Sequence, residues 1–332
     1  MSKTYEKTID IDNFNHILSQ LDYYNDINIT KPYPATLALN FGNCTYYTSL
    51  TGEKSNSPNV GNIIAQLDRF VKKSDYELKN KEEYGYQKTK LDNYKTRITW
   101  NLRDPGNFEY INNKYKLKWL KCYSYDINSA YSFAMLKPMP DTDKPCRKFD
   151  VINKNEIGFY SNGYATTEIG AFAEYIFPLK ESPFKKYVEY YYNKKQNAKS
   201  PEEREIWKSF LNIPSGMMHK VNIFMRLAIL HYAAIYINSF IDENTVYCNT
   251  DSIVSLKARS DIPLGNEIGK FKKEHINEIF KYKQSGIYQW DTICHYKGLP
   301  GIALNDIENT KNWQANLPYK YDEDLRRIIK NG

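Results

Sequence analysis

The chain is poor in cysteine and lacks the patterns in which cysteine usually does work. Its five cysteines lie far apart and none forms a CxxC pair, which disfavours a disulfide framework or a structural zinc site and indicates a reducing compartment. The first residues, MSKTYEKTIDIDNF, lack the apolar core of a signal peptide. The most apolar stretch, 223–241, is interrupted by Arg226, His231 and Asn238, so it does not suit a membrane span. We expect a cytoplasmic protein with no membrane partner.

Glycine-rich phosphate loops of the GxxxxGK[ST] kind are also missing. What remains is a chain able to fold: 332 residues, 41% hydrophobic, long enough for about two domains. The net charge of +7 is concentrated in segments 182–220 and 270–297. These basic zones suggest a polyanionic partner, although a solvated lysine-rich surface explains them as well.

The first hundred residues contain strand-like runs and a polar stretch. Strands are expected at 35–41 and 44–50, and an amphipathic helix at 59–71. The lysine-rich segment 72–97 reads as a linker or a long exposed excursion. A domain boundary is expected near residue 100.

From Trp119 onward the pattern is sharper. The aromatic-rich run WLKCYSYD at 119–126 predicts a strand that ends at Asp126 and is followed by a short helix. Two helices then form a hairpin: the first starts at Ser182-Pro183, and the second starts at a capping box of Ser200 and Glu203 and should end at Pro214. A third helix at 219–241, a β-hairpin at 245–256 and a further helix at 272–282 complete the prediction.

Two aspartates are candidate metal ligands. Asp126 closes a strand and Asp251 lies in a hairpin turn, so both carboxylates meet at one end of a sheet if these strands are neighbours. Magnesium prefers oxygen ligands, and two such ions support in-line phosphoryl transfer. The alternative is that each aspartate is simply a turn residue.

A row of polar side chains on the second hairpin helix could hold phosphates. Arg204, Lys208 and Asn212 are four residues apart and share one face, and Lys195 near the end of the preceding helix could join them. Cations in such a row suit a triphosphate. An exposed basic face paired with neighbouring glutamates is the alternative.

Three short segments resemble the motifs of family B DNA polymerases, and they occur in that family's order. YSYDINSAYS around Asp126 resembles motif A, KSFLNIPSG at 208–216 resembles motif B, and YCNTDSI at 247–253 resembles motif C. FKKYVEYYYNKK at 184–195 is similar to the first finger helix of the protein-primed bacteriophage polymerases. The resemblance covers about 108–298.

The resemblance implies a role for each matching residue. Asp126, Asp251 and the backbone of Ile127 would bind two Mg²⁺ ions, for which Mn²⁺ could substitute. The incoming dNTP would contact Ser129, Ala130, Tyr131, Lys195, Arg204, Lys208 and Asn212. Among these, Tyr131 would stack under the sugar and exclude a ribose 2′-hydroxyl. Primer and template would contact Thr250, Gly216, Tyr288 and Lys297.

The sequence also departs from the family pattern. Asn249 replaces the first aspartate of motif C, Ser215 replaces the tyrosine of motif B, and Gly286 replaces the lysine of a KxY element. Short spacings leave little room for the insertions that hold a priming protein and encircle the template. The first 118 residues are too few for a proofreading exonuclease and lack its acidic motifs. Asp10 and Asp12 are the only candidate acidic pair there, and we interpret them as a turn at the end of a strand.

The resemblance implies an α/β (α+β) fold, a right-hand polymerase palm with an antiparallel sheet, a short helical fingers hairpin and a small thumb. The expected segments are an N-terminal domain at 1–100, palm at 101–181 and 217–280, fingers at 182–216, and a reduced thumb at 281–332.

The expected function is DNA-directed DNA polymerase without exonuclease, for phage or mobile-element replication, and phage origin would place it in the host cytoplasm. Its partners would be a DNA primer–template and dNTP, with a priming protein or other replication subunits as further candidates. The alternatives are a catalytically decayed subunit that binds primer–template, and a primase-like or untemplated nucleotidyltransferase.

Overall fold

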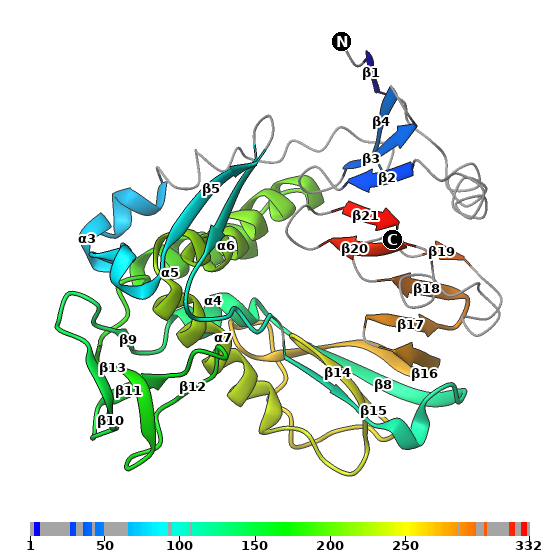
Figure 1. Ribbon diagram of the computed structural model, residues 1–332. Helices are drawn as coiled ribbons and strands as arrows, with labels where there is room; N and C mark the ends of the chain where they lie inside the picture. The colour runs from blue at the N-terminus through cyan, green and yellow to red at the C-terminus, as the bar shows by residue number, and fades with distance from the viewer. Residues whose placement is uncertain are drawn as a thin grey trace. The chain divides into compact units, whose positions relative to one another are not determined.

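The computed structural model describes residues 66–91, 95–106, 108–284 and 286–296, together with the backbone of short strands nearer the ends of the chain. The chain divides into two compact units (Figure 1). The terminal unit comprises Met1–Ser57, Ile111–Tyr123 and Ile276–Gly332, and the central unit comprises Pro58–Tyr110 and Ser124–His275. The division into palm, fingers and thumb segments stays a prediction.

The terminal unit contains a sheet with the strand order β1-β4-β3-β2-β21-β20, in which β1 is parallel to β4 and the other pairs are antiparallel. Its strands are β1 (Lys3–Glu6), β2 (Ile27–Thr30), β3 (Thr36–Phe41), β4 (Cys44–Ser49), β20 (Tyr319–Asp322) and β21 (Arg327–Lys330). The strands predicted at 35–41 and 44–50 are therefore confirmed. Three further antiparallel strands follow the end of β16 (Phe271–Gln284): β17 (Ile287–Trp290), β18 (Ile293–Tyr296) and β19 (Ile302–Ala303).

The main sheet of the central unit has the order β16-β8-β15-β14-β7. Figure 1 shows β8, β14, β15 and β16 of this sheet. Its other strands are β7 (Glu109–Ile111), β8 (Leu120–Ile127), β14 (Thr245–Asn249) and β15 (Ser252–Ser255). Strand β8 and the antiparallel β14–β15 hairpin confirm two predictions. The helix predicted at 272–282 is wrong, because this segment belongs to β16. Phe280 and Tyr282 pair with Trp290 and Tyr288 of β17, and this tertiary pairing decides for a strand over the predicted helix.

Four helices pack together in the central unit: α4 (Ala130–Met135), α5 (Lys185–Gln196), α6 (Pro201–Val221) and α7 (Ile223–Asn238). The α5–α6 hairpin confirms the prediction, and Ser200 caps α6 by accepting a hydrogen bond from the Glu203 amide at 3.1 Å. Glu203 reaches back to the amide of Lys199 rather than to that of Ser200. In the part of the chain that the structure describes, no helix combines the length and the apolarity needed to cross a membrane.

Helix α6 does not end at Pro214 as the sequence predicts; it continues to Val221. Proline lacks the amide hydrogen that would bond the carbonyl four residues earlier, which belongs to Phe210. The Tyr187 hydroxyl of α5 donates to that carbonyl at 2.8 Å and compensates for the missing bond. The helix ends instead at Asn222, whose side chain then accepts from the Met225 amide and caps α7.

The described parts of the segment 72–97, which are 72–91 and 95–97, form secondary structure instead of the expected linker. They form α3 (Lys73–Tyr76), a 3₁₀ turn η2 (Lys81–Tyr84) and the hairpin of β5 (Gln87–Leu91) and β6 (Lys95–Thr99). The segment is polar overall, but its side chains Tyr76, Leu78 and Tyr84 are all buried in the main core, which the composition alone does not indicate. Of the helix predicted at 59–71, residues 66–70 are helical and 59–65 lie outside the described residues.

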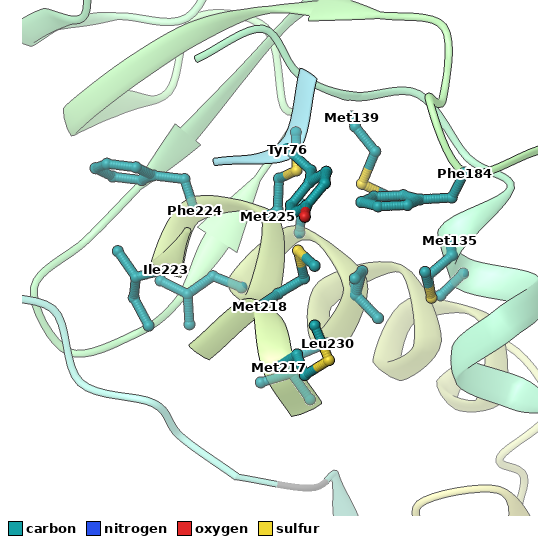
Figure 2. Packing of buried hydrophobic residues seen from close by; sticks show 14 of the residues in the cluster. Tyr76, Met135, Met139, Phe184, Met217, Met218, Ile223, Phe224, Met225 and Leu230 are labelled. Carbon is teal, nitrogen blue, oxygen red and sulfur yellow. The ribbon is translucent and has the colours of Figure 1, made fainter. Parts of the chain in front are cut away.

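The main core of the central unit joins side chains from distant parts of the sequence. Figure 2 shows Tyr76 of α3, Met139 and Phe184 around Met225 of α7, with Met217 and Met218 of α6 close by. A small sheet lies beside α7, built from β9 (Met139–Pro140), β10 (Arg147–Val151), β11 (Glu156–Phe159), β12 (Ala165–Thr166) and β13 (Phe172–Lys180). Burial of this apolar surface, which includes Ile157, Phe159 and Phe177 of the small sheet, holds the helices against that sheet.

Candidate active site

The structure brings Asp126 and Asp251 together. Asp126 lies at the end of β8, and Asp251 lies in the turn between β14 and β15, on the strand pair that neighbours β8. The amide of Ile127 donates to the carbonyl of Asp251 at 2.7 Å, so the two segments are directly hydrogen-bonded. The sequence predicts that these aspartates meet at one end of a sheet, and the geometry agrees.

The two carboxylates also interact electrostatically. Burial, and then the charge of Asp126, raises the pKa of Asp251 to about 7. Burial and the charge of Glu274 raise the pKa of Asp126, while Lys272 and Lys208 act in the opposite direction. Burial and a neighbouring acid disfavour ionisation of each of these two carboxyl groups, and a divalent cation bound between them would favour the ionised forms.

Strand β16 adds two charged side chains that the sequence reasoning missed. Lys272 Nζ lies 3.1 Å from Asp126 Oδ2 and 2.7 Å from Glu274 Oε1. Residues two apart on a strand share a face, so a strand assignment for this segment would have placed Lys272 and Glu274 beside each other. The incorrect helix assignment hid them.

The turn after β8 is held by a buried lysine. Ser129 has a φ of +56°, in the left-handed region that few side chains adopt. Lys195 of α5, which is 6% exposed, donates from Nζ to Ser129 Oγ at 2.9 Å. Lys195 is therefore held at the side chain of Ser129, in the segment whose backbone the sequence predicts to approach the phosphates of a nucleotide.

Arg204, Lys208 and Asn212 are exposed along one face of α6, as the spacing predicts. The charge of Lys208 lowers the pKa of Asp126, so this face of α6 is close enough to the carboxylate of Asp126 to influence its ionisation. Gly216 is exposed one turn further along α6, and a Cβ built there meets no described atom within 4 Å. The local packing of the described residues therefore does not require a glycine at this position.

Tyr131, the first-turn residue of α4, is held between two groups. Arg226 of α7 lies over its ring with the guanidinium carbon 5.7 Å from the ring centre, and the Thr250 hydroxyl hydrogen-bonds its phenol. Burial raises the pKa of Tyr131 to about 12, so the phenol is neutral at physiological pH.

Arg226 is fixed in turn by Asp104, with 3.0 Å between Nε and Oδ2. Burial opposes ionisation of this acid, but His219 and Arg226 hold the pKa of Asp104 well below its usual value.

The two remaining predicted residues belong to the terminal unit. Tyr288 lies in β17 of the terminal unit, where its ring stacks on His295 with 4.8 Å between ring centres. Lys297 lies outside the described residues. Within the described ranges, no group of three or more His, Cys, Asp and Glu side chains is arranged to hold a metal ion. The oxygen donors present, from Asp126, Asp251 and the Ile127 carbonyl, are of the kind that Mg²⁺ prefers.

Comparisons with known proteins give a likeness of fold only. No family model matches the sequence, and a search of curated proteins finds no match. Among solved structures, the orthorhombic crystal form of phi29 DNA polymerase matches with a TM-score of 0.53 at 13% identity, covering 81% of this chain and 66% of that chain. Phi29 DNA polymerase complexed with single-stranded DNA matches with a TM-score of 0.51 at 14% identity, covering 73% and 60%.

The primer–template complex of phi29 DNA polymerase matches with a TM-score of 0.50, also at 14% identity, covering 71% of this chain and 54% of that chain. The chain thus spans less than two-thirds of the length of these polymerases. The mixed α+β architecture with an antiparallel palm sheet is confirmed, and the chain has a fold that distantly resembles that of a DNA polymerase.

Proposed function

We propose that this protein is a DNA-directed DNA polymerase that transfers a nucleotide from a dNTP to the 3′-hydroxyl of a primer. The observation that carries the proposal is the meeting of Asp126 and Asp251, which are remote in sequence, at one end of an antiparallel sheet beside the cationic face of α6. The likeness of fold to a DNA polymerase supports it. Each feature alone has a simpler explanation, and the combination favours this chemistry.

Asp126, Asp251 and the Ile127 carbonyl would hold two Mg²⁺ ions, and Mn²⁺ is the expected substitute. Bound there, the metal would supply a lowered pKa for the primer hydroxyl and neutralise charge on the phosphates. Burial, and then the charge of Asp126, raises the pKa of Asp251, and this supports the fit because a shared cation would offset both effects. Glu274 and Lys272 would tune the local charge around Asp126.

The cationic side chains would bind and orient the triphosphate. Lys208 and Arg204 project from one face of α6, and Lys195 of α5 donates to the hydroxyl of Ser129. Charge at these positions stabilises the transition state because negative charge accumulates on the leaving pyrophosphate. Asn212, on the same face, would lie beside the incoming base, and Thr250, Gly216, Tyr288 and Lys297 would contact primer or template.

A catalytically decayed subunit is the second candidate, and the residue that favours it is Asn249. Asparagine there removes a negative charge near Asp251, and its side chain is already hydrogen-bonded to Tyr247 and Thr250. Such a subunit would bind primer–template without extending it. A primase-like or untemplated nucleotidyltransferase is the third candidate, which would keep the chemistry and lose the dependence on template sequence.

Primer extension separates these candidates. We would compare the wild-type protein with Asp126→Ala and Asp251→Ala in Mg²⁺ and in Mn²⁺, on templates of defined sequence. Asp150→Ala is a matched control, because Asp150 lies on β10 and is paired with Arg147.

Template-matched products that disappear in both active-site variants and persist in the control support the polymerase. Binding of primer–template without incorporation in either metal supports the decayed subunit, and products that ignore the template support the third candidate.

A further inference from the structure

A chain of side-chain hydrogen bonds runs through the β14–β15 turn. The phenol of Tyr247, which is 3% exposed, donates to Glu109 Oε1 of β7 at 2.7 Å. Asn249 Nδ2 donates to the same phenol oxygen at 3.1 Å, and Asn249 Oδ1 accepts from Thr250 Oγ1 at 2.9 Å. The Thr250 hydroxyl is hydrogen-bonded to Tyr131. We refer to these five side chains as the relay.

The backbone of the turn needs such support. Thr250 has a φ of +59°, a left-handed conformation that costs a β-branched residue about 1–2 kcal/mol. Its amide donates to the carbonyl of Phe108 at 2.8 Å, so the residue next to Glu109 also anchors the turn. The relay and this backbone bond together hold Thr250 in place, and with it the contact to Tyr131.

The donors and acceptors give the relay a direction. A carboxylate can only accept, a phenol has a single hydrogen, and an amide can both donate and accept. Because Glu109 accepts the hydrogen of Tyr247, the phenol oxygen is left to accept, and the residue at 249 must donate to it. Asparagine does this at position 249, and an aspartate could not.

We propose that Asn249 is a positioning residue matched to Glu109, and that the relay holds Tyr131 where it discriminates between deoxyribose and ribose. The inference rests on the proposed polymerase function, in which Tyr131 contacts the sugar. The proposal explains why Asn249 stands where the family pattern has an aspartate. Because Glu109 takes the hydrogen of Tyr247, the side chain at position 249 has to be a donor, and asparagine is one. Asn249 acts through Thr250 and Tyr131, and needs no contact with the nucleotide itself.

A double-mutant cycle tests this pairing with four proteins: the wild type, Asn249→Asp, Glu109→Gln and the double variant. In Asn249→Asp, two carboxylates compete for one phenol hydrogen. In the double variant the new glutamine can donate to Tyr247, which can then donate to the new aspartate, so the relay is complete in the reversed direction. Glutamine alone can still accept from Tyr247, so Glu109→Gln should change little.

The first readout is the selectivity for dNTP over the matching rNTP, from kcat/KM in single-nucleotide primer extension. We expect Asn249→Asp to lower this ratio about tenfold, the effect of losing one hydrogen bond to a charged group. The double variant should return to within about twofold of the wild type. Asn162→Asp, which adds the same charge at an exposed turn, should leave the ratio unchanged. Wild-type selectivity in Asn249→Asp, or no recovery in the double variant, would overturn the proposal.

The second readout is the melting temperature of the four metal-free proteins, which needs no activity. We expect the melting temperature of Asn249→Asp to be several degrees lower than that of the wild type. Adding Glu109→Gln should restore the melting temperature in the double variant. If the wild type extends no primer, the polymerase function fails, and the melting cycle alone decides the relay. Strictly additive shifts would then overturn it, and recovery in the double variant would support the pairing.

Discussion

Substitution of Asp251 by asparagine should stabilise the metal-free protein at neutral and alkaline pH. Burial and the charge of Asp126 raise the pKa of Asp251 from 3.8 to about 7, a shift of about three units. At about 1.36 kcal/mol per unit, ionising this group in the folded state costs up to about 4 kcal/mol relative to the unfolded chain. Asparagine has no charge to bury, so Asp251→Asn should recover a large part of this free energy above pH 7.

The pH dependence gives this prediction its sign. Between about pH 4 and pH 7 the folded protein holds a proton on Asp251 that the unfolded chain releases, because the folded pKa is the higher one. The free energy of unfolding therefore falls as pH rises through this window, by the contribution of this group. Asp251→Asn removes the contribution, so the two proteins should differ most at pH 8 and least near pH 4.

Urea unfolding in EDTA at pH 4, 6 and 8 measures the difference. Asp143→Asn provides a control of opposite sign, because the hydrogen bond from Lys79 lowers the pKa of Asp143 and its removal should destabilise the protein slightly at pH 8. Added Mg²⁺ should stabilise the wild type more than Asp251→Asn. An Asp251→Asn protein that is no more stable than the wild type at pH 8 in EDTA would refute the electrostatic account of the site.

Three further predictions concern nucleotide and DNA contacts. Tyr131→Val should admit ribonucleotides, and unchanged sugar selectivity in primer extension would remove Tyr131 from this role. Lys208→Ala should raise KM for dNTP about ten- to a hundredfold, the cost of one charged hydrogen bond; Lys186→Ala, on the exposed side of α5, serves as its control, and equal KM values would contradict the triphosphate contact. Gly216→Ala should gain up to about 1 kcal/mol of helix stability, since a Cβ fits there, yet weaken primer–template binding in a titration if DNA approaches α6 closely.

Secondary structure is predicted correctly from the sequence where the residues that determine it lie within the same short segment. The strand that ends at Asp126 and the β-hairpin around Asp251 have aromatic and β-branched runs that stop at turn residues, and both appear where expected. The Ser200 cap is likewise local, since the side chain bonds an amide three residues away. These are also the segments that place the two aspartates, so the centre of the candidate site is predictable.

Prediction fails where a distant residue decides the local structure. Nothing near Pro214 shows that the hydroxyl of Tyr187 will satisfy the carbonyl of Phe210 and let α6 continue. The sequence predicts a helix at 272–282, and pairing with β17, which the local sequence does not show, makes the segment a strand. The relay is hidden for the same reason, because Glu109 carries no motif and meets Tyr247 only in the folded chain.

The uninterrupted course of α6 has a mechanical consequence. A rod that spans Pro201–Val221 transmits a small tilt at one end as a large displacement at the other. Arg204 lies about 27 Å from Asn222 at 1.5 Å per residue, so a tilt of about 5° at that junction carries the Arg204 side chain through about 2 Å. If the helix had broken at Pro214, a tilt at Asn222 would not be transmitted to Arg204.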